Sequence, residues 1–174
     1  LDLKNIQLFN YARPKDNNVN AAVSDKVSEE NLYFYHDKSP INTLSKEISA
    51  YQSANVSKII KVKTVTLNSI LDNSAFSDKP IDFLSIDVEG FEYDVLLGLT
   101  KKTGIISFEF ASEFIENAYK SIDYLTSLGY SDFNYSLGER RKFYGQWSNA
   151  DIIKENISNN IKQDNLLWGD FYCK

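Results

Sequence analysis

The sequence predicts an α/β fold, in which helices cover both faces of a sheet that contains parallel strands. Two segments carry this prediction: "IDFLSID", residues 81–87, and "GIISFEF", residues 104–110, are apolar runs without clean alternation. Such runs are typical of parallel strands that are buried on both faces. The segment between them places Phe91, Val95 and Leu99 on one face of a helix. A strand, a helix and a second strand in this order favour a parallel pair.

Upstream of this unit the sequence alternates between helical and extended patterns. "LKNIQLFNY", residues 3–11, predicts a short helix that ends before Pro14, because proline disfavours helix at the residue before it. A second short helix is expected in "INTLSKEISAYQ", with Thr43 as its cap and Glu47 near enough to complete a capping arrangement. The remaining upstream elements are strands over 18–25, 31–36 and 59–67 and one or two helical turns over 68–73.

Downstream of residue 110 the pattern predicts a helix, a strand, a second helix and a closing strand. The first helix carries apolar residues at helical spacing from Phe114 to Leu125 and ends at Gly129, a favourable terminating residue. The second helix has Asn149 as its cap and an isoleucine at every fourth position. The two strands are "DFNYSL", residues 132–137, and "LLWGDFYC", residues 166–173.

The composition limits the kinds of partner and location. A formal net charge of -5 argues against nucleic acid, whose binding proteins concentrate lysine and arginine on one face. The single cysteine, Cys173, permits no internal disulfide and fits a reducing compartment, so we expect a cytoplasmic protein. No apolar run approaches the roughly 20 residues of a membrane-spanning helix, so no membrane partner is expected. The 174 residues, of which 43% are hydrophobic, suit one domain.

Carboxylates follow both core strands at their carboxyl ends, where ligands bind in α/β sheets. Asp87 and Glu109 end consecutive strands, and Glu89 and Glu92 follow Asp87 closely. Asp87 suits orienting an acceptor hydroxyl, binding a divalent cation or taking a proton. The alternative is that Asp87 caps the helix beginning near Gly90.

The other three acids also have two interpretations each. Glu89 suits the same tasks as Asp87 but is equally an ordinary first-turn residue of a helix. Glu92 is interpreted mainly as a solvated or dipole-stabilising residue. Glu109 either pairs with Asp87 around a metal or the acceptor, or is satisfied by a neighbouring lysine or backbone amide.

The run "IDFLSIDVEGFEYDVLLG" resembles the signature of the FkbM family of S-adenosylmethionine-dependent methyltransferases. In that signature a strand ends in Asp-x-Glu-Gly and leads into a helix ending in Leu-x-Gly. "RPKDNNVNAAVSD", "INT" and "VKTVTLNSIL" are similar to the upstream segments of the family, so the resemblance covers roughly residues 10–135. It implies a Rossmann-like class I methyltransferase sheet with a C-terminal antiparallel strand pair, which residues 132–137 and 166–174 would form.

The family's glycine-rich turn and the acidic residue that holds the ribose have no counterpart in this sequence. We therefore expect the sheet to be missing its first strands, with residues 1–174 forming a single, N-terminally truncated domain. A missing strand leaves a neighbouring strand edge unpaired, which favours association with another chain and thus an oligomer.

The resemblance implies S-adenosylmethionine as the cofactor and O-methylation of a hydroxyl on a sugar or polyketide-like acceptor. The expected catalytic residues are Asp87, Glu89 and Glu109, and the expected cofactor-binding residues are Ala22, Ser24 and Asp87; no metal site is assigned. Ala22 and Ser24 lie where the third strand of such folds meets the adenine, although small residues also pack well in strands.

Two alternatives from other classes stay open. One is a non-catalytic, Rossmann-like module that binds a glycan or a partner and has lost cofactor binding. The other is a metal-dependent hydrolase that uses Asp87, Glu89 and Glu109. No histidine ligand for its metal lies nearby in the sequence.

Five further residues have a functional and an ordinary interpretation, and the ordinary one is preferred for each. Arg13 and Lys15 would attract an anionic acceptor or form an exposed basic loop. His36 would be a general base or a surface residue. Trp147 and Trp168 would stack on a sugar ring or pack near the final hairpin.

Overall fold

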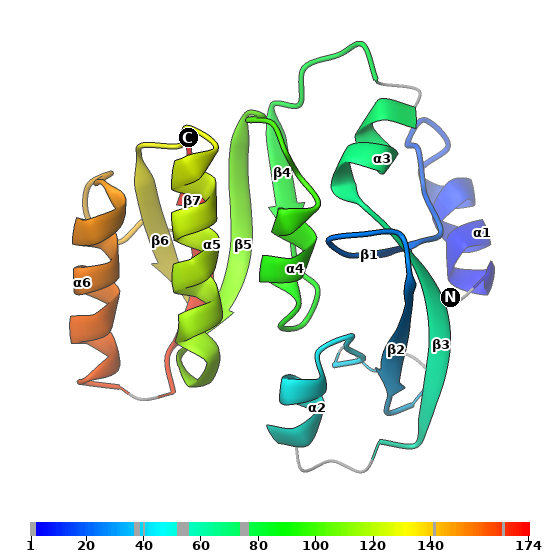
Figure 1. Ribbon diagram of the computed structural model, residues 1–174, viewed down its shortest axis with the longest axis horizontal. Coiled ribbons are helices and arrows are strands. Elements are labelled where there is room, and N and C mark those ends of the chain that lie inside the picture. Colours follow the sequence, from blue (N-terminus) through cyan, green and yellow to red (C-terminus); the bar gives the residue numbers. More distant parts are fainter. Residues whose placement is uncertain are drawn as a thin grey trace.

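The computed structural model describes residues 3–36, 39, 41–51, 56–73, 77–140, 142–164 and 166–174, which form an α/β fold with two mixed sheets (Figure 1). The three-stranded sheet has the order β1-β3-β2, with β1 at Ala22–Val23, β2 at Glu29–Phe34 and β3 at Lys58–Val65. The four-stranded sheet has the order β4-β5-β7-β6, with β4 at Phe83–Ile86, β5 at Ile105–Ala111, β6 at Phe133–Leu137 and β7 at Trp168–Cys173.

The four-stranded sheet contains both strand pairs that the sequence predicts. β4 and β5 are parallel, with Phe83 opposite Ile105. β7 lies between β5 and β6 and is antiparallel to both. The predicted parallel unit and the predicted C-terminal antiparallel pair are therefore confirmed, and the carboxyl ends of β4 and β5 lie at the same edge of the sheet.

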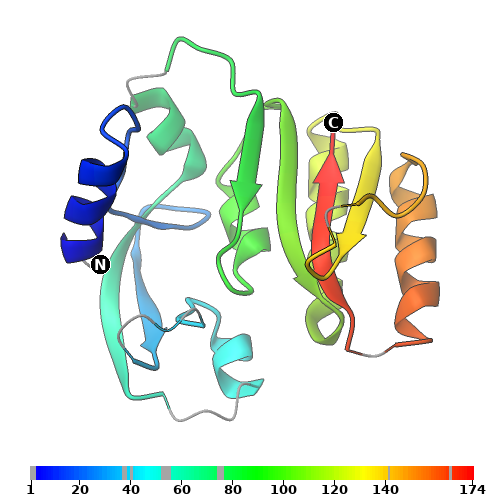
Figure 2. The ribbon, with the colours of Figure 1, turned by 180° about the vertical axis from the view of Figure 1, so that it is seen from behind.

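Helices α4 (Glu92–Leu97) and α5 (Ile115–Ser127) lie on the same face of this sheet (Figures 1 and 2). A 3₁₀ turn, η1 (Ser112–Phe114), leads from β5 into α5, and α6 (Ala150–Ile161) packs against α5 and β6. The Asn149 side chain accepts a hydrogen bond from the Ile152 amide, which confirms the predicted cap. The largest fully buried side chains of this core include Phe108, Phe133, Phe171, Ile122, Leu125, Ile153 and Ile157.

The elements of the three-stranded sheet agree with the sequence less closely. Helices α1 (Leu3–Ala12) and α3 (Leu67–Asn73) and strands β2 and β3 form as predicted, but the strand expected over 18–25 is only the two residues of β1. Helix α2 (Lys46–Tyr51) forms within residues 41–52, of which residue 52 lies outside the described residues.

The prediction that Thr43 caps α2 is wrong, because a tertiary contact uses its hydroxyl. The cap is Ser45, whose side-chain oxygen accepts from the Ile48 amide at 3.2 Å. Thr43 instead donates its hydroxyl to the carbonyl of Glu89 at 2.7 Å. A residue beside the helix thus connects it to the turn that follows β4.

The two sheets meet along α4. The carbonyl of Gly98, at the end of α4, accepts from the Asn68 amide at 3.0 Å, and a Cβ added to Gly98 would lie 2.6 Å from the Ser24 carbonyl oxygen. Among the described strands only β5 pairs with β4, and Phe83 on β4 is 52% exposed. Association through this edge stays a prediction. None of the helices in the described ranges is both long and apolar enough to cross a bilayer.

Candidate functional site

The turn after β4, residues 87–90, has an unusual backbone conformation. Glu89 has φ 56° and Gly90 has φ 86°, and Glu89 is the one non-glycine residue with positive φ in the described part of the chain. A left-handed conformation costs a residue with a Cβ roughly 1–2 kcal/mol. Such a conformation persists only where the surroundings impose it, and it is frequent at functional sites.

Three contacts hold this turn in place. The Glu92 carboxylate accepts from the amides of Val88 at 3.2 Å and Gly90 at 3.0 Å. Thr43 donates its hydroxyl to the Glu89 carbonyl. Ile48 packs so closely that a Cβ on Gly90 would lie 2.3 Å from its Cγ1. The turn is therefore positioned both by its own helix and by the segment that carries α2.

Glu92 is buried, so the interpretation of this residue as solvated is wrong. Only 8% of it is exposed, because its side chain folds back over the turn. Burial raises the pKa of the Glu92 carboxyl, the hydrogen bonds from backbone amides oppose this shift, and the charge of Asp87 adds to it.

Asp87 does not cap α4, so that alternative is also wrong. The helix begins at Glu92, and the residue at its N-cap is Phe91, with no side-chain hydrogen bond. Asp87 is instead exposed at the end of β4. Its negative charge contributes to raising the pKa of four carboxyl groups, those of Glu89, Glu92, Glu109 and Asp170.

Glu109 has the most perturbed carboxyl of this group. Its pKa is raised from the ordinary 4.5 to about 7, first by burial and then by the like charges of four neighbouring acids: Asp87, Glu89, Glu92 and Asp170. Among the described residues neither a salt bridge nor a hydrogen bond is found for its carboxylate. A carboxyl that titrates near neutral pH is suited to accept and release a proton.

Asp170 is a member of the acidic group that the sequence analysis missed. It lies on β7 directly opposite Glu109 on β5. Burial raises the pKa of Asp170, and the charges of Asp87 and Glu139 raise it further. The sequence contains an alternation along β7 but no signal for its register against β5, which fixes this neighbour.

A pocket of about 210 Å³ lies beside these acids. It is bounded by α2, the turn after β4, the end of β5 and the start of α5, and Figure 1 shows α2 just beyond the turn that joins β4 to α4. Tyr51 and Phe114 form one wall, with ring centroids 5.2 Å apart and planes at 86°. Four glutamates contribute to the lining of the pocket: Glu89, Glu92, Glu109 and Glu113. Asp87 lies outside its lining.

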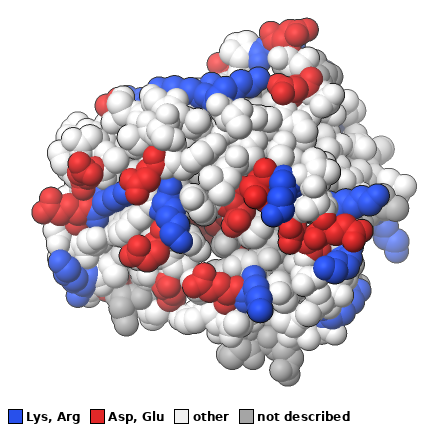
Figure 3. Space-filling view, in the orientation of Figure 1, with Lys and Arg blue, Asp and Glu red and all other residues white. Residues whose placement is uncertain are grey.

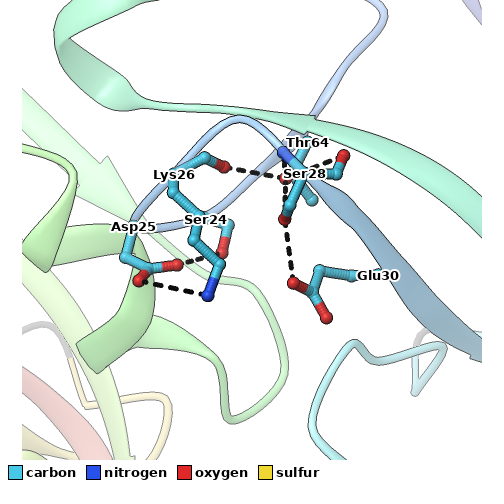
Figure 4. Close-up of polar contacts among 6 residues, drawn as sticks. All are labelled: Ser24, Asp25, Lys26, Ser28, Glu30 and Thr64. Atoms are coloured by element: carbon cyan, nitrogen blue, oxygen red, sulfur yellow. Dashed lines mark hydrogen bonds and ion pairs between the residues drawn. The ribbon is translucent and has the colours of Figure 1, made fainter.

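The residues expected to bind the cofactor lie elsewhere, at the three-stranded sheet. Ala22 is half-buried and stands opposite Thr64 in the parallel pair of β1 and β3. Ser24 is 1% exposed, and its hydroxyl donates to Asp25 at 2.9 Å (Figure 4). Thr64 braces the loop after β1 by donating to the Lys26 carbonyl at 2.8 Å. The structure thus brings Asp87, Glu89 and Glu109 together and places Ala22 and Ser24 outside the pocket lining.

The remaining residues weighed from the sequence have contacts of their own or are exposed. Arg13 forms an ion pair with Asp16 at 2.6 Å. Trp147 packs against Phe143, with ring centroids 5.2 Å apart. Trp168 is 44% exposed, and His36 is exposed. None of these residues lines the acidic pocket.

The surface charges are mixed. Figure 3 shows acidic and basic side chains interspersed over the face seen in Figure 1. No group of three or more histidine, cysteine, aspartate or glutamate side chains placed to hold a metal ion is found among the described residues.

Comparison with protein families identifies the family of the chain. A model of the methyltransferase FkbM domain matches residues 2–131. No curated protein and no solved structure matches significantly.

Proposed function

Because the chain belongs to the FkbM methyltransferase domain family, we propose that it is an S-adenosylmethionine-dependent O-methyltransferase acting on a hydroxyl of a sugar or polyketide-like acceptor. One observation carries this proposal. Carboxylates from the ends of two parallel strands gather at one edge of the four-stranded sheet, and the pKa of one of them, Glu109, is about 7. On this proposal the chain is a single domain with a Rossmann-like class I sheet.

The chain's own residues fit the cofactor in part. Asp87 is exposed at the end of β4 and is free to accept hydrogen bonds from a bound ligand. The hydroxyl of Ser24 is buried and donates to Asp25, so Ser24 offers backbone and packing surface rather than a free donor. S-adenosylmethionine would supply an electrophilic methyl group to the acceptor oxygen.

Glu109 is proposed as the base that takes the hydroxyl proton as the oxygen–methyl bond forms. Its raised pKa means that it is half ionised near pH 7, so the fraction able to accept a proton rises through neutral pH. Glu89 and Asp87 would orient the hydroxyl by accepting its hydrogen bond. Holding the oxygen in line with the methyl group would contribute much of the rate acceleration.

The buried Ser24 hydroxyl favours the second candidate, a binding module without catalysis. Such a module would keep the aromatic and acidic pocket but would not bind the cofactor. Calorimetric titration of the chain with S-adenosylhomocysteine separates the two. Binding that weakens in an Asp87→Ala variant supports the methyltransferase, while absence of binding to the wild-type chain contradicts it and leaves the binding module.

A further inference from the structure

The lining of the acidic pocket carries charge of one sign. Four glutamates contribute to it, and no described lysine, arginine or histidine does. Lys120 lies against the ring of Tyr93, with its Nζ 6.0 Å from the centroid, but Lys120 itself is not part of the lining. An anionic group entering this pocket would therefore meet repulsion from several sides.

The four glutamates differ in their hydrogen-bond and salt-bridge partners. Glu92 is held by two backbone amides, and Glu113 accepts from the Tyr51 hydroxyl at 3.4 Å. Glu89 and Glu109 have no salt-bridge partner among the described residues. Glu89 thus places a half-buried carboxylate at the pocket without a compensating cation, an arrangement that a positively charged ligand would stabilise.

The rest of the lining is suited to one ring. Tyr51, Phe110 and Phe114 provide aromatic surface, and Asn117 and Ser121 provide polar groups. The volume of about 210 Å³ is below the roughly 300 Å³ at which pockets for drug-sized ligands begin. Aromatic faces also attract cations, so the walls and the glutamates favour the same kind of group.

Resting on the proposed function, we propose that the methyl acceptor is a cation: an alcohol with an amine on a single ring. Its ammonium group docks among the glutamates that line the pocket, and its ring lies against Tyr51 and Phe114. Acceptors that carry phosphate or carboxylate are rejected by the same glutamates. The geometry therefore points to amino sugars or amino cyclitols rather than sugar phosphates.

Three ring compounds that differ in one substituent test this proposal. They are trans-4-aminocyclohexanol, cyclohexane-1,4-diol and 4-hydroxycyclohexanecarboxylate, each titrated into the ¹⁵N-labelled chain with and without S-adenosylhomocysteine. We expect the amine to bind about tenfold more tightly than the diol, the carboxylate to bind most weakly, and the shifts to include the amides of Gly90 and Asn117.

Glu113→Gln removes one charge from the rim without touching the proposed base. It should reduce the preference for the amine over the diol severalfold. Glu116→Gln, an exposed glutamate on the next turn and outside the lining, is the matched control and should leave the preference unchanged.

Other outcomes are also decisive. Equal affinity for the three compounds, or carboxylate binding that improves when Mg²⁺ is added, would overturn the cationic acceptor. S-adenosylhomocysteine binding without a preference for the amine would overturn this inference and leave the methyltransferase standing. A preference for the amine without S-adenosylhomocysteine binding would support charge recognition and contradict methyl transfer.

Discussion

The two sheets of the molecule are held together by different kinds of contact. The four-stranded sheet and its helices share a continuous core of fully buried aromatic and aliphatic side chains, such as Phe108, Phe171 and Ile157. The three-stranded sheet relies more on polar contacts, such as those between the buried Thr64 and the loop after β1. Hydrophobic burial provides most of the stability of a fold. We therefore infer that the four-stranded sheet and its helices contribute most of the free energy of unfolding.

The acidic pocket lies where these two regions meet, so residues of both regions form it. Its floor comes from the end of β5 and from α5, while Ile48 and Tyr51 come from α2 on the other side. Thr43 and Ile48 also hold the turn that carries Glu89. The four-stranded sheet thus carries the acids, and contacts from the α2 segment hold the turn in which Glu89 lies.

The difference between the regions is tested most strongly by matched phenylalanine truncations. Phe171→Ala removes a fully buried ring whose centroid lies 4.5 Å from that of Phe110, and should lower the free energy of unfolding by about 4 kcal/mol. Phe34→Ala removes a half-buried ring on β2 and should cost about 1–2 kcal/mol. Denaturant unfolding measures both values, and equal costs would contradict the comparison.

The contact between the regions is tested by Gly90→Ala. This change combines a left-handed conformation with a Cβ that would meet Ile48, so it should cost about 2–3 kcal/mol and reduce turnover. Gly145→Ala is the control, because Gly145 has φ 83° and open space around it, and should cost only about 1 kcal/mol. If Ile48→Ala does not partly restore the Gly90→Ala variant, the packing explanation is wrong.

The role of Glu92 in positioning the turn is tested by two substitutions. Glu92→Gln keeps an acceptor oxygen for the Val88 and Gly90 amides and should retain most activity. Glu92→Leu leaves both amides unpaired and should cost about 1–3 kcal/mol in stability. We expect kcat to fall by a larger factor than KM rises. Similar kinetics for the two variants would show that the hydrogen bonds do not position the turn.

The smallest expected change in stability is that of Glu109→Gln, and it depends on pH. The pKa of Glu109 is raised in the folded chain, so its contribution to stability is present below about pH 4.5 and is lost as the pH rises through about 7. Glutamine has no charge to lose, so the variant should gain about 1 kcal/mol, or about 3 °C in Tm, relative to wild type at pH 8 but not at pH 4. A constant difference at both pH values would refute the assigned cause.

Elements with strong local patterns were predictable from the sequence, and elements defined by distant partners were not. The period of α5 and the cap of α6 are local signals, so their positions were predicted correctly. β1 contains only two residues, fewer than the strand predicted over 18–25. Its length is set by its pairing with β3 rather than by the local apolar pattern. The hydroxyl of Thr43 was assigned to the wrong partner for the same reason.

Only the acids at the ends of the two parallel strands could be predicted as members of the candidate site. Acids at the ends of two parallel strands had to meet at one edge, which placed Asp87, Glu89 and Glu109 correctly relative to one another. The additional members, Asp170 and Glu113, depend on the register of β7 and on the path of the chain from β5 into α5. Neither of these is visible in a short sequence window.

The most direct test of the central claim is a ¹³C NMR titration of the Glu109 carboxyl, assigned by comparison with the Glu109→Gln variant. If the acids of β4 and β5 gather as described, this carboxyl titrates with a midpoint of about 7, and its pKa falls when the charge of Asp87 is removed by Asp87→Asn. A midpoint near the ordinary 4.5 that does not change in Asp87→Asn would contradict both the gathering of the acids and the proposed role of Glu109 as a base.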